Sequence, residues 1–152
     1  MRTVSISILL VLISSCYAWQ VINMEEYIKK TQAEITEESL KLKETLDARL
    51  PVSSKASSGK VETRTVELVN FSNPIFIIGN DAFSKQWLET NAKKLEEVHA
   101  IGFVANIKST EQLESLQIRT QAPLLPANVD DLMEIFHENH YPLALFGDNL
   151  WQ

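Results

Sequence analysis

The cysteine and histidine content of the chain limits the chemistry that its side chains can carry out. Cys16 is the only cysteine among 152 residues, so the sequence contains no Cys-x-x-Cys pair. Thiol–disulfide exchange needs a second thiol to resolve the mixed disulfide, so a redox enzyme of that kind is excluded. His137 and His140 place two imidazoles near one another, but zinc takes three or four ligands and no cysteine accompanies them. We therefore expect no metal and no cofactor.

Motifs for phosphate binding and for serine hydrolysis are missing from the sequence. The four glycines are isolated from one another, so no glycine-rich loop is present to wrap a phosphate group. No Gly-x-Ser-x-Gly elbow occurs either. Asp130 and Asp131 are adjacent, and neighbours on a helix point in different directions, which argues against a catalytic carboxylate pair. These patterns identify no catalytic residue.

Polar residues follow the apolar runs of the chain where α/β proteins bind ligands. Asp81 and Ser84 come directly after one run, and Asn106 lies near the end of the next. Open α/β sheets bind ligands at the carboxyl ends of their strands, so these residues are the best placed for binding. The structural alternative is that they are helix caps and a strand-end turn, because Asp, Asn and Ser are ordinary N-cap residues. Together with the loop before the last apolar run, the candidate binding face consists of Asp81, Ser84, Asn106, His140, Tyr141 and Pro142.

Two apolar runs and the helix between them must position this face. Ile75–Ile78 and Ala100–Ile107 are apolar at successive residues, which is typical of strands buried on both faces of a parallel sheet. Parallel neighbours need a crossover connection, and Asn80 or Asp81 is suited to cap a helix there. We expect that helix to end at His99. Its buried face is predicted to contain Phe83, Trp87, Leu88, Ala92, Leu95 and Val98.

Further strands are predicted at the edges of the sheet. Val61–Val69 is rich in Val and Thr and indicates an edge strand, followed by a turn over Asn70–Pro74. Leu124–Leu125 lies between two prolines, which are tolerated at a sheet edge. Leu143–Phe146 and Leu150–Gln152 indicate a hairpin.

Two more helices are predicted between these strands. Ser109 and Gln112 form a capping-box pattern that opens a short helix. Asn128 is suited to cap the second helix, and Asn139 to stop it in a left-handed conformation. The side chains expected to face inward are Leu113, Leu116 and Ile118 in the first helix and Leu132, Met133 and Phe136 in the second.

The order of these elements predicts the fold class. A βαβ half, a helix and a β-hairpin with Pro142 just before it make a thioredoxin-like α/β sheet with helices on both faces. A small doubly wound flavodoxin-like sheet is the alternative. The Tyr141–Pro142 bond is a candidate for the cis isomer, which is the minority form of X-Pro bonds.

Residues 1–18 resemble an export signal. Arg2 precedes an apolar core at Val4–Ile13, and a small polar stretch follows at Ser14–Ala18. About ten apolar residues cannot span a membrane, which takes about 20. Two processing routes remain open, namely cleavage after Ala18, and lipidation of Cys16 in a sequence similar to a bacterial lipobox.

Composition divides the rest of the chain. Residues 19–50 form an amphipathic helical segment, in which Met24–Leu46 is either a partner-binding or coiled-coil helix or a helix that lies on the domain or is mobile in solvent. Residues 51–60 indicate a flexible Ser/Gly linker, and residues 61–152 the α/β domain. The net charge of −6 and the pI of about 5.1 argue against a basic face for nucleic acid.

From Leu50 onward the sequence resembles a bacterial family of integrating conjugative element proteins. The segments that carry the resemblance are Leu50–Val52, Gly59–Val61, Pro74–Asp81 with Ser84 and Trp87–Leu88, Ala100–Asn106, Leu125–Pro126, Asp130–Leu132 and His140–Leu143.

The resemblance implies an exported, non-enzymatic accessory or assembly component encoded with conjugative type IV secretion machinery, and it implies no reaction. Its expected partners are other transfer proteins in the periplasm, with no direct contact to nucleic acid and with membrane attachment only through a lipidated Cys16. The alternative is a periplasmic enzyme or small-ligand binder that uses the face near Asp81 and His140.

Overall fold

The computed structural model describes residues 24–67 and 73–152 of the chain. It divides into two compact units, residues 1–36 and 37–152, and the sheet belongs to the second. In the described residues the elements are, in order, α1 (Met24–Asp47), β1 (Ser57–Ser58), β2 (Arg64–Thr65), β3 (Ile75–Ile78), α2 (Ala82–Glu97), β4 (Ile101–Val104), α3 (Thr110–Gln117), β5 (Leu124–Pro126), α4 (Asp130–Phe136), β6 (His140–Tyr141), β7 (Leu143–Phe146) and β8 (Asn149–Trp151).

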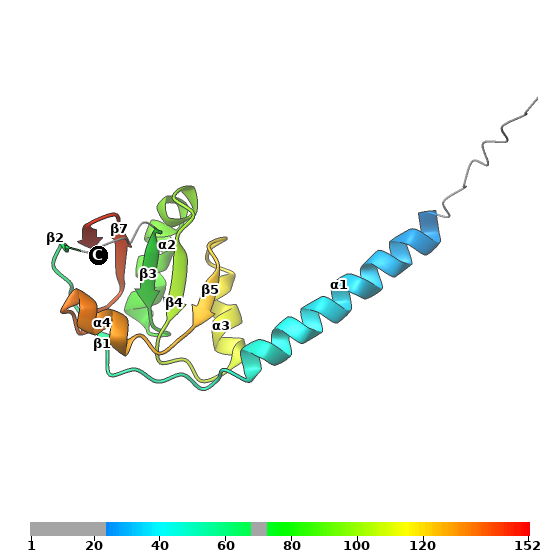
Figure 1. Ribbon diagram of the computed structural model, residues 1–152, viewed down its shortest axis with the longest axis horizontal. Coiled ribbons are helices and arrows are strands. Elements are labelled where there is room, and N and C mark those ends of the chain that lie inside the picture. The colour runs from blue at the N-terminus through cyan, green and yellow to red at the C-terminus, as the bar shows by residue number, and fades with distance from the viewer. Residues whose placement is uncertain (1–23, 68–72) are drawn as a thin grey trace, which may run out of the picture. The chain divides into compact units, whose positions relative to one another are not determined.

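The two central apolar runs lie side by side in a six-stranded sheet with the order β2-β8-β7-β3-β4-β5 (Figure 1). β3 and β4 are parallel, with Ile75 opposite Ile101 and Ile78 opposite Val104. β5 is parallel to β4, whereas β7 is antiparallel to β3. An antiparallel hairpin beside the central strand is the thioredoxin-like arrangement, because a doubly wound sheet would be parallel there. The structure confirms the predicted fold class.

Alternating side chains of β3 pack against helices on opposite faces of the sheet. Phe76 and Ile78 belong to a core cluster with residues of α2 and α3, including Leu88 and Leu116. Ile75 and Ile77 belong to a second cluster that includes Phe136 of α4. Successive residues of a strand point to opposite faces, so the unbroken apolar run supplies both cores.

The predicted strands and turns at the sheet edges are largely confirmed. β5 lies at one edge, where it follows Pro123 and ends at Pro126, and β7 and β8 form the hairpin. The Tyr141–Pro142 peptide is cis, and so is Leu50–Pro51. Of the strand predicted at Val61–Val69, the described residues 61–67 form a strand only at β2, which is antiparallel to β8. Residues 68–72, with most of the turn at Asn70–Pro74, lie outside the described residues, as do residues 1–23 with the predicted signal and Cys16.

Two side chains predicted to be buried are exposed. Phe83 is 42% exposed in the first turn of α2, and Ile118 is 83% exposed because it follows the last residue of α3. The spacing of apolar residues therefore gave the wrong burial at the first turn of one helix and just past the end of another.

The ends of α3 and α4 also differ from the predictions. Gln112 Oε1 accepts a hydrogen bond from the Lys108 amide at 2.9 Å, while the Ser109 side chain makes no cap bond. Asn128 Oδ1 accepts from the Asp130 amide at 2.8 Å, but the N-cap residue of α4 is Val129, one position later than predicted, and its side chain makes no cap bond. The left-handed stop is His137, with φ of 51°, and not Asn139, because α4 already ends at Phe136.

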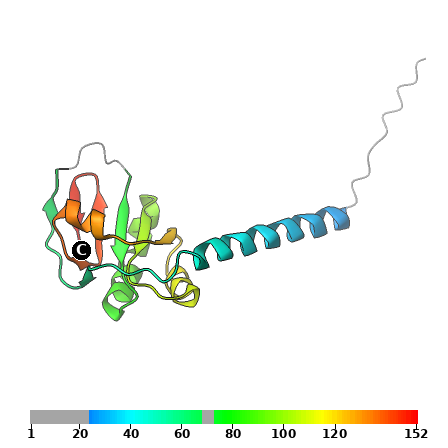
Figure 2. The same cartoon turned by 60° about the horizontal axis from the view of Figure 1, so that its bottom comes forward.

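Residues 51–60 are not a flexible linker. We call Val52–Gly59 the strap, because it crosses the sheet at the carboxyl ends of β3 and β4 (Figures 1 and 2). The Val52 amide donates to the carbonyl of Ile107 at 2.8 Å, and the Lys55 amide donates to Asp130 Oδ1 at 2.7 Å. Composition suggested flexibility, but hydrogen bonds to residues far along the chain hold this segment in place. The linker prediction is therefore corrected.

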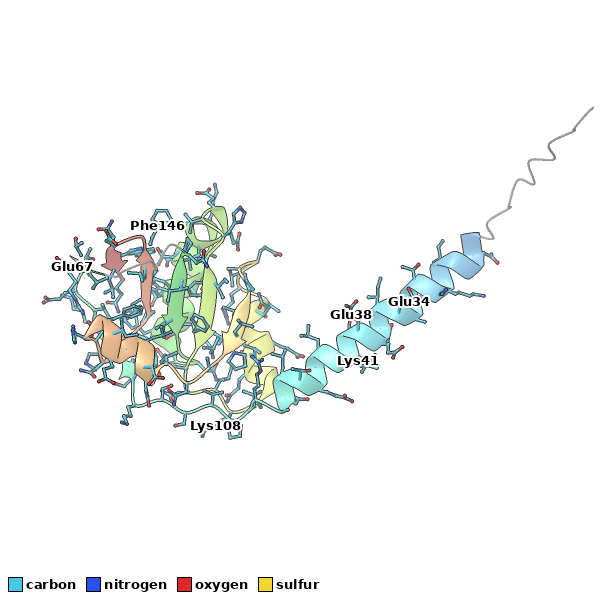
Figure 3. The ribbon with its side chains drawn as sticks, viewed as in Figure 1. Glu34, Glu38, Lys41, Glu67, Lys108 and Phe146 are labelled. Carbon is cyan, nitrogen blue, oxygen red and sulfur yellow. The ribbon has the colours of Figure 1, made fainter. Side chains whose placement is uncertain are left out.

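α1 is helical over the predicted range. Its exposed side chains include charged ones, among them Glu34, Glu38 and Lys41, which Figure 3 labels, and also the apolar Ile28, Ile35, Leu40 and Leu42. Near its C-terminal end Leu46 packs against the core that contains α2 and α3, whereas Leu42 is exposed. In the residues that the structure describes, no helix has the length and apolar character needed to cross a membrane.

Candidate functional site

Asp81 and Ser84 form the N-terminal cap of α2 at the end of β3. Asp81 is the N-cap residue, and its Oδ1 accepts from the Ser84 amide at 2.9 Å. The Ser84 hydroxyl donates to Asp81 Oδ2 at 2.6 Å and accepts from the Gly79 amide at 3.0 Å. Ser84 is fully buried, so its polar atom is committed to this cap.

Asp81 also receives a bond from the strap. The Ser58 hydroxyl donates to Asp81 Oδ1 at 2.7 Å. Partial burial acts to raise the pKa of Asp81, but the hydrogen bonds from Ser84 and Ser58 outweigh it and lower the pKa below its usual value. The carboxylate is therefore held in its charged form as a structural acceptor.

Asn106 joins the end of β4 to the strap. Its backbone is left-handed, with φ of 52°. Its Oδ1 accepts from the Ser54 amide at 2.7 Å, and its Nδ2 donates to the Ala56 carbonyl at 2.8 Å. Nδ2 also lies 3.4 Å from the Tyr141 hydroxyl. Both ends of the amide side chain are thus used within the fold.

His140 and Tyr141 form β6, which pairs in parallel with β1 of the strap. Ser57 lies opposite His140, and Ser58 opposite Tyr141. The Gly59 amide donates to the Tyr141 carbonyl at 2.9 Å, and the Ser57 hydroxyl lies 3.3 Å from His140 Nδ1.

The carbonyl of Pro142 accepts a hydrogen bond from the side chain of Gln152. Gln152 Nε2 donates to the carbonyls of Pro142 at 2.9 Å and of Gly59 at 2.8 Å. Gln152 Oε1 accepts from the Val61 amide at 3.2 Å. The side-chain amide of Gln152 therefore links the C-terminal end of the strap to the β7–β8 hairpin. Sequence analysis did not predict this role, because no pattern of neighbouring residues indicates it.

All six residues of the candidate face lie in contact with the strap or with residues next to it. Their polar groups form hydrogen bonds that hold the strap in place. The contact between Ser57 and His140 resembles a nucleophile and a base, yet Asp81 bonds to Ser58 and does not orient His140. Within residues 24–67 and 73–152, no three His, Cys, Asp or Glu side chains gather where they could hold a metal ion. The arrangement is that of a closed structural junction.

The groove beside the strap is lined by other residues. It has a volume of about 430 Å³ and lies between the strap and the α4–β6 region, with Lys55, Ala56, Asp130, Met133, Glu134, His137, Glu138 and Asn139 along its walls. One wall is fixed by Arg64, which donates to Glu138 Oε2 at 3.1 Å and to the carbonyl of Phe136 at 2.7 Å. Burial acts to raise the pKa of Glu138, but hydrogen bonds from the amide of Asn139 and from Arg64 lower it.

A second, apolar groove of about 570 Å³ lies between the end of α1, α3 and β5. Its apolar walls are Leu42, Leu46, Leu113, Pro123, Leu124 and Leu125. Trp151 of β8 packs against buried Trp87 of α2, with ring centroids 5.5 Å apart and ring planes tilted by 40°, and Lys94 Nζ lies 3.7 Å from the centroid of the Trp151 ring. Phe146, labelled in Figure 3, is exposed on the same hairpin.

Comparison with protein families places the chain in one of them. A model described as "Protein of unknown function (DUF2859)" matches residues 14–149, which is well over half of the 152 residues. That range contains the strap and all six residues of the candidate face. No curated protein and no solved structure matches the chain. The chain therefore belongs to the DUF2859 family of proteins of unknown function.

Proposed function

We propose that this protein is an exported, non-enzymatic accessory or assembly component of the conjugative DNA-transfer apparatus, a type IV secretion system, of an integrating conjugative element. The conjugative assignment is supported by the resemblance carried by Pro74–Asp81, Ala100–Asn106 and His140–Leu143. The non-enzymatic role is supported by the observation that Asp81 and Asn106, in the candidate face, form hydrogen bonds with the strap.

The proposed location is the periplasm, with other transfer proteins as partners. Support for export comes from the sequence of residues 1–18, and cleavage after Ala18 and lipidation of Cys16 remain the two routes. A net charge of −6 supports protein partners over nucleic acid. Mass spectrometry of the processed chain distinguishes a start at Trp19 from a lipid on Cys16, and Cys16→Ala should abolish only the second product.

Co-purification tests the assembly role. The full chain, tagged at its C-terminus and expressed from cells that carry the element, should retain one or more transfer proteins through stringent washing. The matched control is the same tagged chain in cells without the element. If no transfer protein is enriched over that control, the assembly proposal is wrong.

A periplasmic enzyme or small-ligand binder at the same face is the second candidate. It is favoured by the 3.3 Å contact between the Ser57 hydroxyl and His140 Nδ1. It predicts loss of DNA transfer in both Asp81→Ala and His140→Ala. Unchanged transfer in His140→Ala, in a chain whose unfolding midpoint is unaltered, would dispose of this candidate. His140 is the sharper test because Asp81 also caps α2.

A further inference from the structure

The strap adopts an extended conformation that its own residues do not favour. Lys, Ala and Gly are depleted in β-strands, and all three occur between Lys55 and Lys60. Ser57 and Ser58 nevertheless pair in register with His140 and Tyr141. Because local preference does not explain this strand, the β6 edge itself must impose the extended conformation.

The strap is bound mostly through hydrogen bonds of its main chain. The Ser57 amide donates to the carbonyl of Asn139 at 3.0 Å, and the Gly59 amide donates to the carbonyl of Tyr141 at 2.9 Å. One residue before Ser57, the Ala56 carbonyl accepts from Asn106 Nδ2. Such bonds form with any extended chain, as in the addition of a peptide strand to a sheet edge.

At three positions of the strap, however, the surroundings limit which side chain can fit. Ala56 is buried, at 6% exposure, so a large residue has no room there. The hydroxyl of Ser58 is bound by Asp81. A Cβ atom at Gly59 would lie 2.6 Å from Cγ of His140, so only glycine fits without movement of the ring. The Ser57 side chain is exposed and makes its 3.3 Å contact with His140 Nδ1 at the surface, so there is room for other side chains at this position, and the pattern is small residue, any residue, Ser or Thr, Gly.

We propose that the β6 edge, with Asp81 and Asn106, is a peptide-recognition site that Ala56–Gly59 occupies within its own chain. An extended segment of a partner protein with the same pattern replaces it. This site rests on the proposed function, which supplies the partner, and it adds the strand edge to which that partner binds. Replacement is local, because the stretch lies between two anchors, the Lys55 amide bound to Asp130 and the buried side chain of Val61.

The occupant is a different protein and not a second copy of this chain. Two copies that exchange straps form the same hydrogen bonds as before and lose translational freedom, so the exchange has no net gain. A different partner remakes the bonds of the strap and adds contacts elsewhere on its own surface. If the site is free for about 1% of the time, a peptide binds about 100-fold more weakly than to an empty site.

Gly59→Val in the full chain tests the proposal. The probe is a fluorescent peptide with the native sequence of residues 53–61, and binding is followed by anisotropy. The variant strap cannot seat against His140, so the peptide should bind this variant about 100-fold more tightly than the wild type. A peptide with the same Gly59→Val change should bind neither chain. Lys60→Val is the matched control, since that side chain is exposed, and it should behave as the wild type.

Hydrogen exchange covers the case in which Gly59→Val does not fold. In the wild-type chain the amides of Ser57 and Gly59 should exchange through a local opening that is insensitive to denaturant, well before those of β3. Exchange only by global unfolding would overturn the proposal, as would a folded Gly59→Val chain that does not bind the native peptide. Concentration-dependent dimers of the wild type with exchanged straps would overturn the choice of occupant. None of these readouts depends on the co-purification experiment, so either proposal can fail alone.

Discussion

Asn106 offers the sharpest test of how the strap is held. Asn106→Ala removes two short hydrogen bonds, to the Ser54 amide at 2.7 Å and to the Ala56 carbonyl at 2.8 Å. Each such bond contributes about 0.5–1.5 kcal/mol net, so their loss costs about 2 kcal/mol. Alanine must also adopt the left-handed backbone, at φ of 52°, which costs roughly 1–2 kcal/mol. We expect a total loss of about 3 kcal/mol in the free energy of unfolding.

Two further variants separate these contributions. Asn106→Gly tolerates the backbone conformation, so it should lose only the hydrogen bonds and be about 1 kcal/mol more stable than Asn106→Ala. His99 has a similar φ of 53° and an exposed side chain, so His99→Ala measures what it costs to place alanine at a left-handed position without the strap. Because histidine already bears most of the left-handed backbone cost, this change should cost less than about 1 kcal/mol.

Urea unfolding followed by tryptophan fluorescence measures these differences, because Trp87 and Trp151 lie in contact within the sheet unit. Hydrogen exchange at the Ser54 amide should accelerate in both Asn106 variants and not in His99→Ala. The reasoning would be refuted if Asn106→Ala cost no more than His99→Ala, or if Asn106→Gly were as stable as the wild type.

Four other substitutions test neighbouring contacts. Gln152→Ala removes all three hydrogen bonds of the terminal amide and should cost about 2 kcal/mol in urea unfolding; a cost under about 0.5 kcal/mol would mean that the amide does not hold the strap. The folded pKa of Asp81 is lowered, so its contribution to stability is present above about pH 4 and is lost as the pH falls through the folded pKa. Asp81→Asn should cost about 1 kcal/mol at pH 7 and reduce the fall in stability on acidification, and a pH profile identical to that of the wild type would contradict this. Gly79→Ala places a Cβ 2.4 Å from the Tyr141 ring and should cost about 1–3 kcal/mol through overpacking. Gly147→Ala, at φ of +57° with open space around it, should cost only about 1 kcal/mol, and equal costs for the two would refute the close approach at Gly79.

The central strands could be predicted because their signal is local and unusually strong. Four successive apolar residues at Ile75–Ile78 have few other solutions than a strand buried on both faces. The cap at Asp81 and the turn between β7 and β8 follow from the chemistry of single residues with their immediate neighbours. The wrong burial predictions lie at helix ends, with Phe83 in the first turn of α2 and Ile118 just after α3. The spacing of apolar residues does not say which turn of a helix still faces the sheet.

The six residues of the candidate face could be named from the sequence, but their role could not. They were selected as polar residues near strand ends, and the structure brings them to one junction. What occupies that junction depends on contacts between residues 23 to 83 positions apart, such as the Ser58 hydroxyl with Asp81 and Asn106 Nδ2 with the Ala56 carbonyl. No window of the sequence contains both partners.

The amino-acid sequence alone determined the order and direction of the central strands, because burial on two faces and helix capping are properties of short stretches. Only the tertiary structure decided that the serine-rich residues 52–59 are part of the domain and lie across the strand ends. Small polar residues carry no preference of their own, so the acceptors and donors that surround them set their conformation.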